Sequence, residues 1–464
     1  MTASNDLTSL TVAELAKMLA SRRVSAVEIT DACLNRIEKY NDALHSFIDI
    51  YPEESRAAAK AADLARSAGY ALGPLHGIPF GLKDLVDIEG KVTTGGSKVW
   101  ADRISPSTGS LVRRLIAEGM IIAGKTHTVE FAFGSWGTNQ HMGAPRNPWD
   151  MHEHRTPGGS SSGSGVAVAA RLVPWAVGTD TGGSVRTPSA LCGVTGLKTT
   201  AGQIATDGIL PLSTTLDTPG PLARSATDAA ILFEAMRGSG VAAMQAILSG
   251  PAPRDVKGLR LARLPDDERD VVEAAVLAAY DQSLAQLADM GAEIVSIKLP
   301  FRFSNFGTLS GRLIAAEGYS FIKEIIDDPA APVDEDVRAR FAVARTMSVT
   351  DYLRLMRERE TICAKAAAAL AGVDALLTPT TPMTAHLLAT AEKEKIIPSH
   401  FTRMANFLGR CALAVPNGFS PTGLPTSLQI ICAPNAEEMA LRIGRGYQAV
   451  TDWHRRAPAL EGTA

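Results

Sequence analysis

Cysteine, net charge and long apolar runs are all scarce in this sequence, and each scarcity excludes a class of protein. The 464 residues contain five cysteines, an odd number without Cys-x-x-Cys spacing. This argues against a disulfide scaffold or a cysteine-based zinc site. Scattered thiols of this kind are typical of proteins in a reducing compartment, so we expect a cytoplasmic protein.

The small net charge and the lack of apolar runs also limit the partners. A formal net charge of −3 provides no basic face for nucleic acid or for an anionic membrane. No uninterrupted apolar run approaches the roughly 20 residues of a membrane-spanning helix. The first six residues have neither the basic nor the apolar character of a secretory signal. We therefore expect neither nucleic acid nor a membrane as a partner.

Internal repeats, low-complexity tracts and linkers are also missing, which favours one large domain over residues 1–464. Helical periodicity dominates residues 1–70 and 226–370, whereas residues 371–464 contain strand candidates and a last helix. Between residues 75 and 225, short apolar runs alternate with clusters rich in Gly, Ser, Thr and Pro. This alternation predicts a mixed α/β sheet with helices packed on its faces.

Local signals predict individual elements. Ser25 and Glu28 form a Ser-x-x-Glu capping box, which starts a helix. Pro52 opens an alanine-rich stretch that we expect to be helical as far as Ala71. Strands are expected at residues 77–82, 120–123, 173–177, 258–264, 293–297 and 375–379, and within 413–431.

Three runs in the sequence match motifs of nucleotide binding, of hydrolases or of metal sites, but we prefer to interpret each as ordinary structure. The run Gly-Met-Ile-Ile-Ala-Gly-Lys-Thr at 119–126 fits the phosphate-loop pattern, but its apolar spacer residues indicate a strand rather than a flexible loop. The run Gly-Ser-Ser-Ser-Gly at 159–163 fits a nucleophile elbow, yet no strand directly precedes it. His152 and His154 flank Glu153 at a spacing that does not place two metal ligands on one helical face.

A glycine-rich turn ending in a serine is the most informative feature that the sequence does contain. The run Gly-Thr-Asp-Thr-Gly-Gly-Ser-Val-Arg at 178–186 follows an apolar stretch. Glycines allow backbone N–H groups to approach a substrate closely, so a serine behind them is a candidate nucleophile with an oxyanion hole. Lys83 ends another apolar run, and burial there would lower its pKa until it could accept a proton from a serine.

Together these motifs resemble the amidase signature family over nearly the whole chain. The central matches are the runs at 155–164, 178–188 and 191–198. Supporting matches occur at 82–84, 130–134, 216–221 and 423–429. The resemblance implies a single large α/β domain with a central mixed, mostly parallel, twisted sheet covered by helices on both faces. It also implies an amidohydrolase that needs no cofactor and no metal.

The resemblance assigns roles to individual residues. It implies a Ser-cisSer-Lys triad in which Ser184 is the nucleophile, Ser160 the bridging serine after a cis peptide bond, and Lys83 the general base. The backbone N–H groups of Thr181, Gly182, Gly183 and Ser184 would form the oxyanion hole, and Ser161 would support the site. We expect Asp180 and Arg186 to pin the nucleophile loop, and Asp217 to have a structural role.

The substrate is expected to be a small-molecule amide whose identity the sequence does not give. By similarity to relatives, Phe133, Gly134 and Trp136 would face the substrate, and their character hints at an aryl or hydrophobic acyl group. Core packing is an almost equally good interpretation of the two aromatic side chains. Residues 300–350 and those from Phe401 to Phe407 could close the pocket.

Two further questions stay open at the level of sequence. The same signature occurs in the A subunit of glutamyl-tRNA(Gln)/aspartyl-tRNA(Asn) amidotransferases, which is the alternative function, although residues 134–141 depart from the pattern associated with that protein. The helical N-terminal segment could also support a homodimer.

Overall fold

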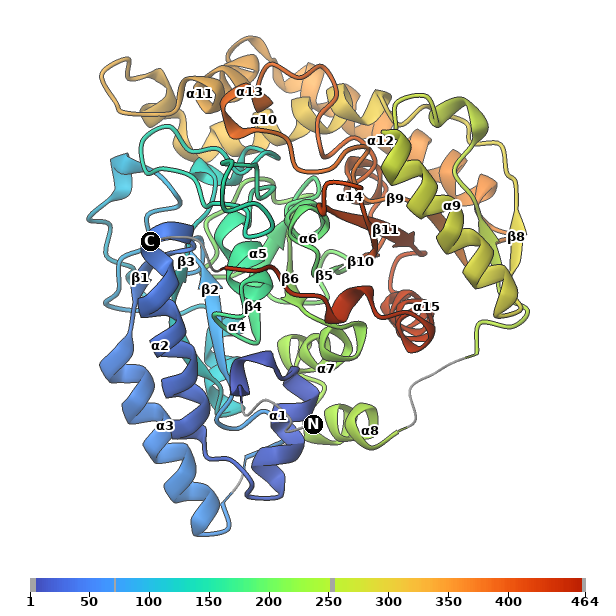
Figure 1. The fold of residues 1–464 in the computed structure, drawn as a ribbon. Coiled ribbons are helices and arrows are strands. Elements are labelled where there is room, and N and C mark those ends of the chain that lie inside the picture. The colour runs from blue at the N-terminus through green and yellow to red at the C-terminus, as the bar shows by residue number, and fades with distance from the viewer. Residues whose placement is uncertain (1–5, 71, 251–254, 461–464) are drawn as a thin grey trace.

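One mixed sheet of eleven strands runs through the molecule and separates two layers of helices (Figure 1). The structure is a computed structural model and describes residues 6–70, 72–250 and 255–460. Across the sheet the strand order is β1-β3-β2-β4-β6-β5-β10-β11-β9-β7-β8. The strands are β1 (Phe47–Ile50), β2 (Pro79–Lys83), β3 (Ile121–Thr126), β4 (Trp175–Asp180), β5 (Thr195–Lys198), β6 (Thr218–Ala223), β7 (Arg260–Ala262), β8 (Glu293–Val295), β9 (Ala375–Pro379), β10 (Ala412–Phe419) and β11 (Pro425–Ile431).

Parallel and antiparallel pairs both occur in the sheet. Strands β3, β2 and β4 are parallel neighbours, and so are β9, β7 and β8. The remaining neighbouring pairs are antiparallel. The predicted single α/β domain with a mixed sheet is confirmed, but the pairs are not mostly parallel as we expected. One reason is the short turn between Phe419 and Pro425, because a connection of that length permits only antiparallel pairing of β10 with β11.

The α-helices fill both faces of the sheet. They are α1 (Val12–Ala20), α2 (Ala26–Leu44), α3 (Pro52–Ser67), α4 (Ser110–Ala117), α5 (Ser162–Ala169), α6 (Arg186–Cys192), α7 (Ala226–Arg237), α8 (Val241–Ser249), α9 (Ala274–Asp289), α10 (Asn305–Asp327), α11 (Glu335–Ala342), α12 (Val349–Ala369), α13 (Leu388–Ala391), α14 (Arg403–Phe407) and α15 (Glu437–Val450). On β5, a side chain at Gly196 would meet Ser189 of α6, whereas its neighbour Thr195 accepts a hydrogen bond from Gln448 of α15. Since successive residues of a strand point to opposite faces, α6 and α15 cover opposite faces of the sheet.

The N-terminal helices form as their capping signals predict. At Ser25 both halves of the capping box are present, and α2 starts at the next residue. Helix α3 begins at Pro52 as expected, but it ends at Ser67 rather than Ala71, and Ala71 lies outside the described residues. In Figure 1 these helices lie together at the lower left, whereas α10 and α11 lie across the top.

Residues 121–126 of the phosphate-loop pattern form a largely buried strand, as its apolar residues predicted. Strand β3 contains Gly124 and Lys125 and pairs with both β1 and β2. The Lys125 ammonium is fully buried and donates to Val86 O and Thr93 Oγ1, with Asp84 as its ion-pair partner at 3.4 Å. The lysine is therefore held within the protein interior.

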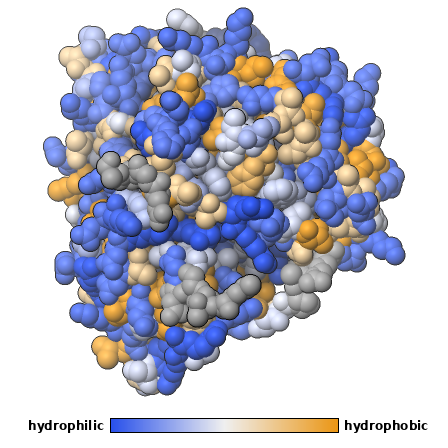
Figure 2. All heavy atoms as spheres, viewed as in Figure 1, coloured by the Kyte–Doolittle hydropathy of each residue, from blue (hydrophilic) through white to orange (hydrophobic). Residues whose placement is uncertain are grey.

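The outer face drawn in Figure 2 is predominantly polar, and its hydrophobic residues occur in small separated groups. Large apolar side chains with substantial exposure include Leu64, Tyr70 and Val349. Within the described ranges, no helix combines the length and the apolar character needed to cross a bilayer.

Candidate active site

Two parallel strands bring the lysine and the glycine-serine turn to the same edge of the sheet. Lys83 is the last residue of β2, and Asp180 is the last residue of β4. In the register of this pair, Leu82 lies beside Val177. The turn at 181–184 therefore begins just beyond Lys83, where side chains from both strand ends can meet.

Lys83 lies at the centre of the candidate site and is fully buried. Its Nζ atom donates hydrogen bonds of 2.8 Å to Ser160 Oγ and of 2.8 Å to Thr179 Oγ1. Burial lowers the pKa of Lys83 to about 7, even though the carboxylates of Asp180 and Asp217 act in the opposite direction. A substantial fraction of this lysine is therefore neutral near pH 7 and able to accept a proton.

Ser160 follows a cis peptide bond from Gly159, as the resemblance implied. Its carbonyl oxygen accepts hydrogen bonds from the Val129 N–H at 3.1 Å and from Thr128 Oγ1 at 3.0 Å. The N–H of Gly159 donates to Ser135 O at 2.8 Å. These bonds hold the segment so that the Ser160 hydroxyl points at Lys83.

Ser184 lies on the other side of the turn and is 8% exposed. It lines a pocket together with Thr181, Gly182, Gly183 and Gly159. In the described part of the chain, no hydrogen bond joins Ser184 Oγ to Ser160 Oγ. Lys83 and Ser160 are thus in direct contact. Ser184 is connected to the same segment through its backbone, because its carbonyl oxygen accepts a hydrogen bond from the N–H of Ser161.

The backbone of the turn presents free donors to the pocket. The N–H groups of Thr181, Gly182 and Ser184 have no acceptor among the residues that the structure describes. Gly183, which we expected to contribute a further donor, instead directs its N–H to Asp180 Oδ1 at 2.8 Å. The N–H groups of the turn that are free to bind a ligand atom are therefore those of Thr181, Gly182 and Ser184.

Asp180 and Arg186 form a fully buried ion pair beneath the turn. Arg186 donates from Nε to Asp180 Oδ2 at 2.9 Å, and it also bonds Thr402 O and Asn406 Oδ1. Burial alone would raise the pKa of Asp180, but the charge and hydrogen bonds of Arg186 outweigh it and hold the pKa well below its usual value. The Asp180 carboxylate also accepts hydrogen bonds from the N–H groups of Gly183 and Val185, so the pair is bonded to the turn.

Ser161 and Asp217 connect the turn to its neighbours. The N–H of Ser161 donates to Ser184 O at 3.2 Å, and its hydroxyl bonds the backbone of Thr179. Asp217 accepts a hydrogen bond from Thr181 Oγ1 and from the N–H groups of Leu212 and Ser213. Burial raises the pKa of Asp217 to about 6 despite these bonds.

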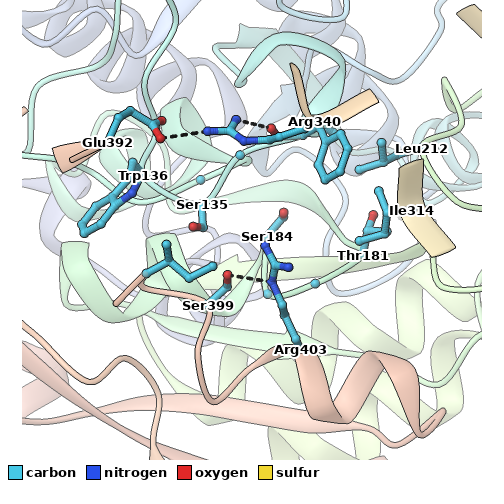
Figure 3. Close-up of a pocket in the computed structure, with 17 residues that line it drawn as sticks. Ser135, Trp136, Thr181, Ser184, Leu212, Ile314, Arg340, Glu392, Ser399 and Arg403 are labelled. Carbon is cyan, nitrogen blue, oxygen red and sulfur yellow. Dashed lines mark hydrogen bonds and ion pairs between the residues drawn. The ribbon is translucent and has the colours of Figure 1, made fainter. Parts of the chain in front are cut away.

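The three residues expected to contact substrate all line the pocket that contains Ser184 (Figure 3). Phe133 is buried and packs edge-on against Phe341, with ring centroids 4.8 Å apart. Trp136 is 1% exposed, and its ring lies 5.7 Å from that of His386. Gly134 lies between them, next to Arg340. The two aromatic rings thus belong partly to the core and partly to the pocket wall.

Sequence reasoning missed several residues of the site. Thr179 accepts a bond from Lys83, and its place directly before Asp180 in the conspicuous turn was the available signal. Other residues come from distant segments. Ile314, Arg340 and Arg403 lie in the segments 300–350 and 401–407 that we expected to close the pocket, whereas the rest lie outside them and had no signal in the sequence. These pocket-lining residues are Leu212, Ile314, Arg340, Glu392, Ile397, Ser399 and Arg403.

Of the charged side chains that line the pocket, Arg340 and Glu392 form an ion pair with each other, whereas Arg403 bonds only neutral oxygens of the described residues. Arg340 forms an ion pair of 2.8 Å with Glu392 and donates to Phe133 O. Arg403 donates from Nε to Ser399 Oγ at 3.1 Å and from Nη1 to Gly307 O at 2.9 Å. Figure 3 shows the Arg403 side chain pointing into the pocket, on the side opposite Arg340 and Glu392.

The loop that contains His152, Glu153 and His154 shows no sign of a metal site. Across residues 6–70, 72–250 and 255–460, His, Cys, Asp and Glu side chains form no group of three placed to hold a metal ion. His152 and Glu153 are exposed loop residues.

Known proteins similar to this chain share its signature. The model of the Amidase family matches residues 28–441. The chain is 36% identical over 448 residues to a 2-amino-5-chloromuconic acid deaminase from Comamonas testosteroni, which covers 95% of this chain and 96% of that protein. It is also 35% identical over 481 residues to the A subunit of the glutamyl-tRNA(Gln) amidotransferase from Thioalkalivibrio sulfidiphilus, covering 97% and 98%.

A solved structure shares the whole fold. The native peptide amidase from Stenotrophomonas maltophilia superposes with a TM-score of 0.83 at 28% sequence identity, covering 97% of this chain and 99% of that one.

Proposed function

Because the chain belongs to the amidase signature family and is thus a hydrolytic amidase, we propose that it cleaves a carboxylic amide through a serine acyl-enzyme. In this proposal Lys83, Ser160 and Ser184 form the catalytic triad. The observation that carries it is the 2.8 Å hydrogen bond between the buried Lys83 Nζ and Ser160 Oγ, beside the pocket that contains Ser184. A buried lysine with a pKa of about 7 fits the role of a general base.

The proposed reaction uses these three side chains as a proton relay. Neutral Lys83 accepts the proton of Ser160, which takes the proton of Ser184 as Ser184 Oγ attacks the amide carbon. The proton then returns through Ser160 to the departing nitrogen, so that the leaving group is a neutral amine or ammonia. Water attacks the acyl-enzyme by the same relay in reverse, which releases the carboxylic acid and restores Ser184.

Negative charge develops on the carbonyl oxygen during both attacks. The unengaged N–H groups of Thr181, Gly182 and Ser184 are the available donors for this charge. Loss of one such donor in other enzymes lowers the rate by about a hundredfold or more. The buried Asp180–Arg186 pair keeps the turn in the shape that presents them.

Alanine variants of the proposed triad test the proposal, with a variant of a neighbouring serine as the control. Ser184→Ala and Lys83→Ala are each expected to lower kcat/KM for an accepted amide by at least about a hundredfold. Ser162→Ala is the control, because the Ser162 hydroxyl lies in the same serine run but has no hydrogen-bond partner among the described residues. A folded Ser184→Ala variant with wild-type activity would overturn the proposal.

A second candidate function is favoured by the similarity to the A subunits of amidotransferases. In that case the same site would release ammonia for a partner protein rather than act alone. The deaminase relative is named for an acid rather than for a tRNA, which favours a small-molecule substrate. Activity of the purified chain on simple amides, without ATP, tRNA or other proteins, supports the first function, whereas a strict need for them supports the second.

A further inference from the structure

Arg403 stands directly beside the candidate oxyanion turn. A Cβ atom at Gly182 would lie 3.6 Å from Arg403 Cγ, so the arginine side chain runs along the turn that carries Ser184. Thr402 fixes this contact, since its Oγ1 donates to Gly182 O at 2.8 Å. The start of α14 is therefore attached to the turn, and the guanidinium of Arg403 faces the pocket (Figure 3).

The guanidinium of Arg403 has N–H donors that no residue of the described chain accepts from. Ser399 Oγ accepts from Nε, and Gly307 O accepts from Nη1. Nη2 has no acceptor among the described residues, and no carboxylate of these residues forms an ion pair with Arg403. An arginine carries five N–H groups in a planar fork, so the side of the fork at Nη2 remains available for a ligand.

The positive charge of Arg403 is not compensated within the pocket. The ionisable residues that line it are Arg340, Glu392 and Arg403, and Glu392 already pairs with Arg340. Burial, followed by the nearby charge of Arg340, lowers the pKa of Arg403 to about 10, so the group is still a cation at neutral pH. Burying a cation without a negatively charged partner raises the free energy of the folded protein, and an anionic ligand would offset this penalty.

We propose that Arg403 binds a carboxylate of the substrate, so that this chain acts on amides that carry a carboxylate a few bonds from the scissile carbonyl. This inference rests on the proposed amide hydrolysis at Ser184 and adds the substrate class. Arginine matches a carboxylate with paired N–H donors, which gives direction as well as attraction. Ile314 and Leu212 line the same pocket and supply an apolar wall for the carbon chain between the two groups.

Matched amides test the inference kinetically. Malonamate, succinamate and glutaramate are compared with propionamide, butyramide and valeramide, which have similar lengths but lack the carboxylate. For at least one length we expect the wild type to prefer the anionic amide in kcat/KM by about ten- to a hundredfold. Arg403→Gln should abolish this preference, whereas Arg403→Lys should keep part of it because the charge remains.

Arg359→Gln is the matched control for the loss of an arginine near α14. Arg359 donates from Nε to Phe407 O, the last residue of the same helix, but it does not line the pocket. The ratio of anionic to neutral kcat/KM should be unchanged in this variant. A ratio that falls equally in Arg359→Gln and Arg403→Gln would mean that α14 has merely shifted, and would overturn the inference.

Binding of dicarboxylates to a variant that cannot turn over tests this inference independently of the proposed function. Calorimetry of Ser184→Ala with malonate, succinate and glutarate needs no turnover, and at least one of the dianions should bind. The affinity should fall by about tenfold or more when Arg403→Gln is added. Failure of all these dianions to bind, or equal binding with Gln at 403, would overturn the carboxylate inference even if Ser184-dependent amidase activity is intact. Conversely, Arg403-dependent binding without Ser184-dependent turnover would overturn only the hydrolytic proposal.

Discussion

At the residue scale, the proposed mechanism depends on the burial of Lys83. The sequence showed only a lysine at the end of an apolar run, and burial was an expectation. The structure places it at 0% exposure with two hydroxyl partners, and burial lowers its pKa to about 7. A side chain that is an ordinary cation in water thereby becomes a base that can work at neutral pH.

Catalysis should depend on pH through the protonation of Lys83. Lys83 must be neutral to accept a proton, and its pKa is about 7, so kcat/KM should rise with pH and level off above about pH 7. Below the midpoint the rate should fall about tenfold per pH unit, because one proton inactivates the base. A pH–rate profile on a neutral amide measures this. A profile that is flat from about pH 5 to about pH 8 would contradict the role of Lys83.

Thr179 accepts a hydrogen bond from Lys83, and we expect it to orient the amine. Thr179→Val removes an acceptor that stabilises the ammonium form, so the pKa of Lys83 should fall further and the acid limb of the profile should move to lower pH. We also expect kcat to fall by about tenfold as the amine loses its orientation. Thr179→Ser keeps the hydroxyl and should restore both values. An unshifted profile in Thr179→Val would show that the contact is only structural.

At the scale of elements, the turn between β4 and α6 was the part most predictable from sequence. Gly182, Gly183 and Ser184 of this turn line the pocket, and the flanking Asp180 and Arg186 form a buried ion pair. The use of the Gly183 N–H was not predictable, because it depends on how the Asp180 carboxylate is rotated beneath the turn. Capping boxes and apolar runs also indicated many helices and strands, since those signals are local.

Gly183 occupies a position of the turn that has no room for a side chain. Its φ is +131°, and a Cβ atom there would lie 2.1 Å from Thr402 Oγ1. Gly183→Ala should therefore displace the turn from α14 and lower kcat by about a hundredfold or more. Gly202→Ala is the control, because Gly202 also has a positive φ of +87° but an added Cβ would meet nothing within 4 Å. Similar activity losses in both variants would contradict this account.

At the scale of the whole molecule, the site depends on contacts between segments that are far apart in the sequence. Arg186 reaches Thr402, Asn406 and Gln429, and Arg403 reaches Gly307. Such contacts have no local signature, which is why the sequence indicated the nucleophile turn but not the residues that enclose the pocket. For the same reason β7 and β9 could be predicted as strands but not as members of the same sheet as β4.

The buried Asp180–Arg186 pair should contribute to global stability. Asp180→Asn leaves the Arg186 charge buried without its partner, and we expect the free energy of unfolding to fall by about 3–5 kcal/mol. Chemical denaturation measures the change. Glu293→Gln removes one partner of the exposed Arg260–Glu293 pair and should cost less than about 1 kcal/mol. Equal effects of the two variants would show that the buried pair does not anchor the turn.

Covalent labelling distinguishes Ser184 from Ser160 and Ser161 as the nucleophile. The protein is treated with a serine-reactive fluorophosphonate, digested, and the modified peptide is located by mass spectrometry. We predict a single adduct on Ser184 that is absent in Ser184→Ala and strongly slowed in Lys83→Ala. An adduct on Ser160 or Ser161 in the wild-type protein, or undiminished labelling of Ser184→Ala, would contradict the account.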